Sequence, residues 1–169
     1  MALLHILQYP HSGLREKAQP ILIFDKSITK LANDMLETMY DAPGIGLAAT
    51  QVNEAKQLLV IDISESKDQP LIIINPKIIL KSGEIINEEG CLSFPDIYAD
   101  VPRAEQIILI YQSLDGKEQQ LDTDDLLAIC IQHEMDHLQG IVFVDYLSAL
   151  KRNRIRKLLE KKQRDQQNG

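Results

Sequence analysis

Cysteine is scarce in this sequence, whose 169 residues include only Cys91 and Cys130. With 44% hydrophobic residues, a chain of this length can bury a sizeable core in one domain, so it has little need of a disulfide bond. We therefore expect free thiols or metal ligands at both positions, and a single domain over residues 1–169.

Long apolar runs are absent as well. No stretch approaches the roughly 18 apolar residues that a membrane-spanning helix needs. Residues 1–10 carry an apolar patch, but they lack the positive charge and the small-residue cleavage site of a secretion signal. We expect a cytoplasmic protein that has no membrane partner.

Positive charge is in deficit, since the formal net charge is -7. This balance argues against DNA binding and against general nucleic-acid binding. The exception is the stretch 151–164, where eight basic residues accompany a single acid, Glu160. Its spacing predicts a basic helix over 147–165, which taken by itself indicates a solvated amphipathic helix. The apolar stripe of this helix would consist of Leu150, Ile155, Leu158 and Leu159.

The most informative feature that is present is the pentapeptide H-E-M-D-H at 133–137. On a helix, His133 and His137 project from the same face roughly 6 Å apart, close enough to share one metal ion. Glu134 lies beside them and can reach a water molecule that such an ion activates. The surrounding segment is largely apolar, and buried ionisable groups need a partner such as a metal. The pattern predicts metal-assisted hydrolysis.

Apolar periodicity is helical near the start of the chain and extended in its middle. A helix is expected over 27–40, with Asp25 or Ser27 as its N-cap. Three β-branched runs predict strands. They are 58–63, 71–75 and 78–86, and the last contains a turn or bulge signal at 81–83.

Further along, Asp115-Gly116 is a hairpin signal between extended runs at 106–112 and 118–121. A helix of about 15 residues then starts at an N-cap within 122–124, carries H-E-M-D-H and ends near Gly140. The order of helix, strands and helices indicates an α+β fold. We expect antiparallel or mixed β-sheets packed around a central metal-binding helix, with an N-terminal and a C-terminal helix.

A catalytic ion held by two histidines needs a third protein ligand and an open position for water. One group of metalloproteases places a third histidine six residues after the second, but Phe143 occupies that position here. Another group uses a later glutamate; Glu160 has lysines as neighbours and is expected to form exposed ion pairs instead. Cys130 lies seven residues before His137, roughly 10.5 Å along the helix, which is too far to share one ion with it.

Cys91 is the candidate that this elimination leaves. It follows Gly90, which frees the backbone to bend, and a thiolate with two imidazoles suits a soft or borderline metal ion. An isolated cysteine is more often a buried free thiol. The failure of the other three candidates favours Cys91 as the third ligand.

Residues 44–49 match the G-x-G-x-x-A pattern of dinucleotide sites, and Asp62 ends a strand-like run further on. That pattern must follow a strand, whereas the residues before it are predicted to be helical. Nucleotide binding is therefore not expected.

Three segments together resemble one family, the bacterial peptide deformylases. They are GIGLAATQ at 44–51, EGCLS at 89–93 and QHEMDHL at 132–138. The similarity covers nearly the whole chain, which is similar to the subtype with a long C-terminal helix. It implies a single catalytic domain over residues 1–169.

The resemblance implies a metal centre. Cys91, His133 and His137 would bind one divalent ion, Fe(II) in the cell, with Zn, Ni or Co able to take its place. Glu134 would act as general acid and base.

The resemblance also implies how substrate is bound. The Gln51 carboxamide and the backbone N–H of Leu92 would stabilise the negative oxygen that forms when a formyl carbonyl is attacked. An extended peptide would lie as an added strand against Gly44, Ile45 and Gly46.

A pocket for the methionine side chain is implied as well, and Gly90 is counted with the substrate-binding residues. For Leu126 and Ile129, ordinary core packing is a nearly equal interpretation. Asn87 lies close by, where an apolar residue is more usual in the family, and would make the pocket slightly more polar. We place the pocket on Ile45, Glu89, Leu126, Ile129, Cys130 and His133.

The implied activity is hydrolytic removal of the formyl group from N-formylmethionine of newly synthesised polypeptides, with release of formate. The implied partners are formylated nascent peptides and the ribosome, which the basic helix would contact, and we expect a monomer. One rival is another H-E-x-x-H metallopeptidase. Another is a structural metal module, which needs a fourth protein ligand; His5 and His11 lie in a different part of the chain.

Overall fold

The computed structural model describes residues 2–168. Its α-helices are α1 (Lys26–Asp41), α2 (Asp125–Leu138) and α3 (Ala149–Asn168). Its strands are β1 (Gly46–Ala48), β2 (Leu58–Ile61), β3 (Leu71–Ser82), β4 (Ile85–Cys91), β5 (Phe94–Arg103), β6 (Gln106–Gln112) and β7 (Glu118–Asp124). Short 3-10 helices span Ser12–Arg15, Ala49–Val52 and Phe143–Tyr146. Within residues 2–168, no helix combines the length and the apolarity needed to cross a bilayer.

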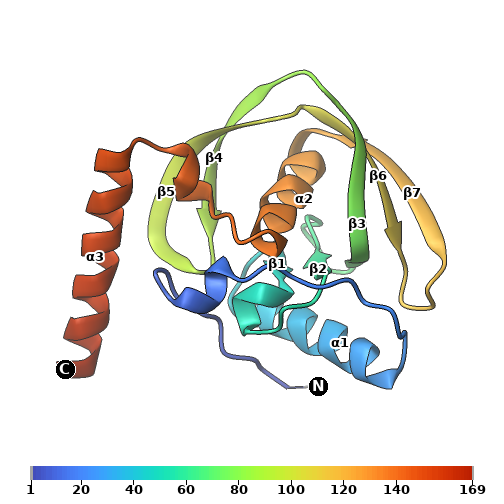
Figure 1. Ribbon diagram of the computed structural model, residues 1–169, viewed down its shortest axis with the longest axis horizontal. Coiled ribbons are helices and arrows are strands. Elements are labelled where there is room, and N and C mark those ends of the chain that lie inside the picture. Colours follow the sequence, from blue (N-terminus) through green and yellow to red (C-terminus); the bar gives the residue numbers. More distant parts are fainter. Residues whose placement is uncertain (1, 169) are drawn as a thin grey trace.

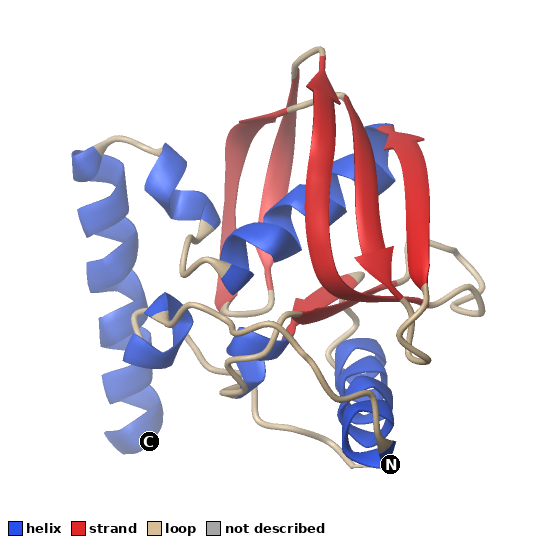
Figure 2. Cartoon of the chain, turned by 45° about the vertical axis from the view of Figure 1, so that its right-hand side comes forward, coloured by secondary structure: helices blue, strands red, loops and turns tan. Residues whose placement is uncertain are grey.

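The strands form two antiparallel sheets. The larger has the order β1-β2-β3-β6-β7, and the smaller pairs β4 with β5. Helix α2 lies between the two sheets, as Figures 1 and 2 show from two directions. The predicted α+β class with a central helix is confirmed. Strand β1 has a sheet neighbour on one side only, so its other edge is free for pairing.

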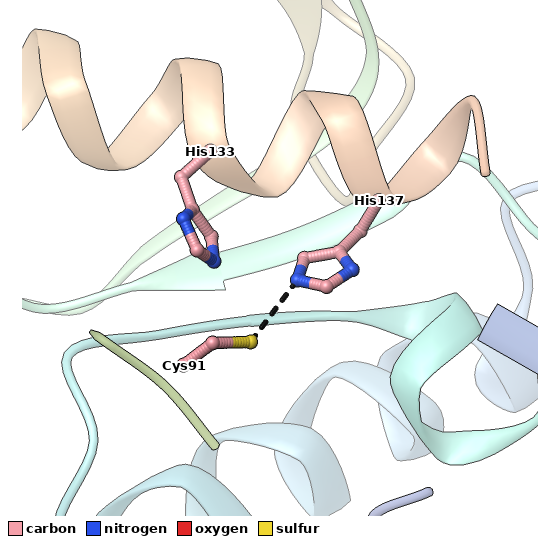
Figure 3. Close-up of side chains that lie close together, drawn as sticks. All are labelled: Cys91, His133 and His137. Atoms are coloured by element: carbon pink, nitrogen blue, oxygen red, sulfur yellow. Dashed lines mark hydrogen bonds between the residues drawn. The ribbon is translucent and has the colours of Figure 1, made fainter. Parts of the chain in front are cut away.

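Most residues of helix α2 are buried, because the two sheets cover two of its faces. One side packs Ala128, Ile131 and Leu138 against Leu59 and Ile73 of the larger sheet. The side that carries the two histidines is turned toward Cys91, the last residue of β4 (Figure 3). The H-E-M-D-H segment is therefore held inside the molecule.

Helix α1 begins at a predicted N-cap. The carboxylate of Asp25 accepts hydrogen bonds from the N–H groups of Ser27 and Ile28 at 3.0 and 3.4 Å. The helix buries one apolar side against β1 and β2, which fixes the position of β1 beside the site. The residues in this contact are Ile28, Ala32, Met35 and Met39 of the helix and Leu47, Leu58 and Val60 of the strands.

Strand β3 differs from the prediction because it joins two expected strands into one. It runs from Leu71 to Ser82 across a register shift after Ile74, whereas separate strands over 71–75 and 78–86 are expected from the sequence. Asn75 takes the left-handed conformation at this shift, with φ 51, and a bulge of this kind accommodates Pro76. The turn signal at 81–83 is confirmed, since Gly83 has φ 69 between β3 and β4.

Strand β5 is absent from the expected elements. Its ten residues include two prolines and two aspartates, which are depleted in strands. It forms because it pairs along its length with β4, from Ile85 opposite Arg103 to Gly90 opposite Tyr98. Pairing with the strand that precedes it thus overrides a weak local signal.

Helix α3 stands at one side of the molecule and touches the rest by a narrow part of its surface (Figure 1). Leu159 is buried in a cluster that includes Tyr9, and Ile155 packs against that cluster. Leu150 and Leu158 stay 70% and 45% exposed, so the predicted stripe is wrong at these two positions. The side of the helix that carries Ile155 and Leu159 meets this cluster, and Leu150 and Leu158 lie outside it.

Candidate active site

Cys91, His133 and His137 come together inside the molecule. Their ligand atoms lie within 4.8 Å of one another, and Cys91 Sγ is 3.3 Å from His137 Nε2. Figure 3 shows both imidazoles projecting from one side of α2 toward the sulfur. Burial, followed by the nearby His133, lowers the pKa of His137 well below its ordinary value, so this imidazole is in the neutral form that binds metals. The donor set and its spacing fit one transition-metal ion.

Two local features bring together Cys91, His133 and His137, the candidate metal-binding group. The four-residue spacing puts the two histidines on one side of α2. On the sheet side, the β4–β5 pairing shifts register between Gly90 and Cys91, so that Gly90 lies opposite Tyr98 but Cys91 opposite Phe94. Such a bulge re-aims the side chain that follows it.

A buried set of charged groups supports His133. Its Nδ1 is 2.8 Å from Glu89 Oε1, which leaves Nε2 for the ion. Arg103 donates to both oxygens of Glu89 at 2.8 Å and to Asp136 at 2.6 Å. Burial alone would raise the pKa of Glu89, but the hydrogen bonds from Arg103 and His133 outweigh it and hold the pKa below its ordinary value. Partners of this kind fix the orientation of a metal-ligating imidazole.

Glu134 lies beside the metal-binding group in a dry environment. Burial raises its pKa to about 7, against the opposing effect of His133. Its Oε1 is buried without a hydrogen-bond partner in the described part of the chain. Its Oε2 is so close to Gly46 that a Cβ at position 46 would lie 2.6 Å away. A carboxyl group with these properties is suited to taking up and returning a proton.

A cavity of about 700 Å³ opens beside the metal-binding group. Apart from His137, all residues that the sequence predicts for the site line it, and Asn87 does so too. Leu126 is 42% exposed, which disfavours ordinary core packing for it. Burial raises the pKa of Cys130 to about 12, so its neutral thiol suits an apolar wall. The predicted residues in the lining are Gly44, Ile45, Gly46, Gln51, Glu89, Gly90, Cys91, Leu92, Leu126, Ile129, Cys130, His133 and Glu134.

Gln51 lies in the 3-10 helix that follows β1, and its carboxamide is held at both ends. Oε1 accepts from the N–H of Ala48 at 2.9 Å. Nε2 donates to Ser93 Oγ at 3.1 Å and lies 3.5 Å from Cys91 Sγ. Leu92 is the next residue after that sulfur and lines the cavity. A carboxamide and a backbone segment thus border the metal-binding group, as donors to an oxyanion must.

Some supporting residues escape the sequence analysis. Arg103 and Tyr146 reach Asp136 from β5 and from the 3-10 helix after α2, and no local pattern marks either one. Ser93 belongs to the EGCLS segment, which is the signal that could have found it, but the sequence suggests no role for its hydroxyl. A second cavity of about 680 Å³ borders Arg103 and Asp136 and contains none of the predicted site residues.

Comparisons with known proteins match nearly the whole chain. The profile of the family described as polypeptide deformylase matches residues 3–153, so most of α3 lies beyond it. The peptide deformylase of Nitrosococcus oceani is 60% identical over 164 residues, which cover 97% of this chain and 98% of the relative. The peptide deformylase of Pseudoalteromonas translucida is 55% identical over 161 residues, which cover 95% and 96%.

Solved structures agree with these relatives. A peptide deformylase from Legionella pneumophila superposes with a TM-score of 0.94 at 45% identity, and the match covers 99% of both chains. A peptide deformylase from Ehrlichia chaffeensis, in complex with actinonin, superposes with a TM-score of 0.93 at 38% identity, covering 97% of this chain and 99% of the other.

Proposed function

Because the chain belongs to the peptide deformylase family, whose members are metal-dependent hydrolases, we propose that Cys91, His133 and His137 hold its catalytic metal ion. The enzyme removes the formyl group from N-formylmethionine of newly synthesised polypeptides and releases formate. The observation that carries the proposal is the convergence of the three ligand atoms within 4.8 Å from two separate elements, β4 and α2.

We propose Fe(II) as the ion in the cell. A divalent ion held by one thiolate and two imidazoles supplies the Lewis acidity that activates a water molecule and polarises the formyl carbonyl. Zn, Ni and Co suit the same donors, so the donor set alone does not select among them. Elemental analysis of protein purified without oxygen tests the choice, and zinc as the sole bound metal would contradict it.

Glu134 is the general acid and base of this proposal. Its carboxylate takes a proton from the water whose oxygen adds to the formyl carbon. When the carbon–nitrogen bond breaks, Glu134 returns that proton to the departing amine of methionine, and the carbon leaves as formate. The unpartnered Oε1 supports this role, because it leaves one oxygen free to meet the water.

Gln51 and Leu92 are the proposed donors to the negative oxygen of the tetrahedral intermediate. The Gln51 carboxamide lies 3.5 Å from the sulfur of Cys91, and Leu92 follows that sulfur in the chain. Donors held in place before the reaction need no rearrangement when the charge develops.

The substrate peptide is proposed to pair with the free edge of the larger sheet. Strand β1 is at that edge, and Gly44 to Gly46 lead into it beside the cavity. The methionine side chain would enter the part of the cavity formed by Ile45, Leu126, Ile129 and Cys130. The carboxamide of Asn87 lines the same cavity and gives this pocket a polar group.

Replacing Glu134 by Gln tests the assigned chemistry. We expect Glu134→Gln to keep its metal and to lose at least a hundredfold in formate release from a formyl-Met peptide, since the amide cannot carry the proton. Cys91→Ala is the matched variant, and its metal content should fall because it lacks one proposed ligand. Unchanged turnover in Glu134→Gln, or unchanged metal affinity in Cys91→Ala, would contradict the respective role. Cleavage of unformylated peptides without formate would favour the rival metallopeptidase.

We also propose that α3 docks on the ribosome, in the cytoplasm where formylated chains are made. Its basic side chains support this, because they are exposed and can reach RNA phosphates. We also propose a monomer, because one chain supplies all the residues proposed for the active site. The exposed basic residues are Lys151, Arg154, Arg156, Lys157, Lys161 and Arg164.

Charge reversal tests the docking proposal. Arg154, Lys157 and Lys161 lie on one side of α3, and changing all three to Glu should reduce co-sedimentation with ribosomes at least tenfold at low salt. Activity on short formyl peptides should stay the same. The matched control makes the same charge change at exposed lysines elsewhere, Lys17, Lys26 and Lys67. Equal losses in both triple variants would point to general charge rather than to α3.

A further inference from the structure

Ser93 carries a buried hydroxyl beside the Gln51 carboxamide. It is 0% exposed, and its Oγ accepts a hydrogen bond from Gln51 Nε2 at 3.1 Å. We propose that Ser93 is a positioning residue that fixes the orientation of the Gln51 carboxamide, which rests on the oxyanion role proposed for Gln51.

The orientation of the carboxamide matters because its two ends are chemically opposite. The end near Ala48 must be the oxygen, since the backbone N–H of Ala48 can only donate. The other end is then the NH2 group, which faces Ser93 and the sulfur of Cys91. A flipped carboxamide would set two donors against each other at Ala48 and place its oxygen beside the thiolate.

Because the Ser93 hydroxyl accepts one hydrogen of that NH2 group, the two hydrogens point in different directions. One hydrogen goes to Ser93 Oγ. The second is left for the side of the metal-binding group, where Nε2 is 3.5 Å from Cys91 Sγ. Without the serine, the NH2 end is left with the longer contact of 3.5 Å to Cys91 Sγ, and the carboxamide can turn more readily about its last torsion, which is broad for glutamine.

The distance between Gln51 and Ser93 is set by the N-terminal segment. The N–H of Leu7 donates to the carbonyl of Gln51 at 2.7 Å, and the N–H of Tyr9 donates to the carbonyl of Ser93 at 2.9 Å. Between them, Gln8 Nε2 donates to the carbonyl of Leu92 at 3.2 Å. Residues 7–9 therefore hold the backbone of both proposed oxyanion donors and of Ser93 by hydrogen bonds.

A nucleophilic role for Ser93 does not fit its surroundings. A nucleophilic hydroxyl needs a base within hydrogen-bond reach. Among residues 2–168, the hydrogen-bond partner of Ser93 Oγ is the Gln51 carboxamide, which is no base. Ser93 therefore acts through Gln51 and not on the substrate.

A double-mutant cycle on the metal-loaded enzyme tests the proposal, with formate release from a formyl-Met peptide as the readout. Ser93→Ala should lower kcat about tenfold, as the loss of one hydrogen bond does, with KM and metal content within twofold. Gln51→Ala should lower kcat about a hundredfold. The double variant should be no slower than Gln51→Ala alone, because a residue that acts only through Gln51 has nothing left to orient.

A further tenfold loss in the double variant, or full activity of Ser93→Ala, would overturn the proposal and leave the role of Gln51 standing. Full activity of Gln51→Ala would instead overturn the proposed oxyanion role, and the inference with it. Ser113→Ala, which removes a hydrogen-bonded hydroxyl from the β6–β7 hairpin, should keep full activity.

Hydrogen exchange of the Gln51 side-chain amide can be measured on the unchanged protein, so it tests the proposal even if Ser93→Ala does not fold. NMR of the zinc-loaded protein should resolve two distinct side-chain amide hydrogens for Gln51, one of them strongly protected from exchange. Two equally unprotected hydrogens would overturn the proposal.

Discussion

At the scale of single residues, Glu134 and Gly46 share too little space for a methyl group between them. A Cβ at position 46 would lie 2.6 Å from Glu134 Oε2, which is the far end of a flexible side chain. We expect Gly46→Ala to push the carboxylate aside at little cost in stability. The free energy of unfolding should change by no more than about 1 kcal/mol, while kcat falls at least tenfold.

Gly140→Ala is the matched control for this prediction. Gly140 has φ 75, and a Cβ there would lie 2.6 Å from the backbone oxygen of Arg15, which cannot move aside. That substitution should lower the free energy of unfolding by about 1–2 kcal/mol and leave kcat of the folded enzyme intact. Chemical denaturation and initial rates measure both quantities. Equal activity of the two variants would show that Glu134 does not need its present position.

At the scale of elements, α3 is anchored by very few side chains. Leu159 is 2% exposed, whereas its neighbour Leu158 is 45% exposed. We expect Leu159→Ala to lower the free energy of unfolding by about 2–4 kcal/mol and Leu158→Ala to change it by less than about 0.5 kcal/mol. Urea unfolding of the two variants measures the difference. Similar values would mean that α3 does not pack as described.

Asp62 directly follows strand β2 and connects α1 and the following loop to the sheet. Its carboxylate is buried and accepts from Tyr40 Oη at 2.5 Å, from Ser64 N at 2.9 Å and from Gln69 N at 3.2 Å. Burial alone would raise the pKa of Asp62, but the hydrogen bonds from Ser64 and Tyr40 outweigh it and hold the pKa below its ordinary value of 3.8. The ionised group therefore stabilises the fold.

The sign of the pH effect follows from that lowered pKa. The stability that Asp62 contributes is complete above its unfolded value of 3.8 and is lost as the pH falls through the lower folded value. Asp62→Asn should be less stable than the parent at pH 7, and the difference should shrink as the pH falls below 3.8. Urea unfolding of the metal-free proteins across this range checks it. Parallel stability curves would contradict the assignment.

Local signals account for the elements that the sequence predicts well. The Asp25 cap of α1 and the Asp115-Gly116 hairpin each depend on a few adjacent residues, and both elements form where expected. Strand β5 forms because it pairs with β4 and not because its own residues favour a strand. Its proline-containing sequence therefore does not predict it. The exposure of Leu158 could not be predicted either, because periodicity shows which residues share a side of a helix but not how much of that side is covered.

At the scale of the whole molecule, the proposed metal ion joins two layers. Cys91 comes from the smaller sheet and the two histidines come from α2. An ion at a thousand times its dissociation constant would add about 4 kcal/mol to stability, so chelation should lower Tm on the order of 10 °C. Amide exchange should speed up most in β4 and β5. Cys91→Ala is the control, since its Tm should barely respond to the chelator.

The site shows the same division between local and distant information. His133, Glu134 and His137 can be predicted from one helix because their spacing is local. Elimination from the sequence points to Cys91, but only the paired strands explain how its sulfur reaches the helix. The support that Arg103 gives to Glu89 has no counterpart in the sequence, because it depends on the pairing of β5 with β4, and β5 is not among the predicted strands.

The free edge of β1 has a cost for a protein in a crowded solution. An unpaired strand edge is a template on which copies of the same chain can pair and aggregate. Here that edge belongs to a strand of only three residues, Gly46–Ala48, and Leu92 packs so tightly over Gly44 that a Cβ there would lie 2.6 Å away. Such an edge offers too few hydrogen bonds for stable association between copies, although it is long enough for the short peptide that we propose to bind there. The shortness of β1 would thus allow an open peptide site without loss of colloidal stability.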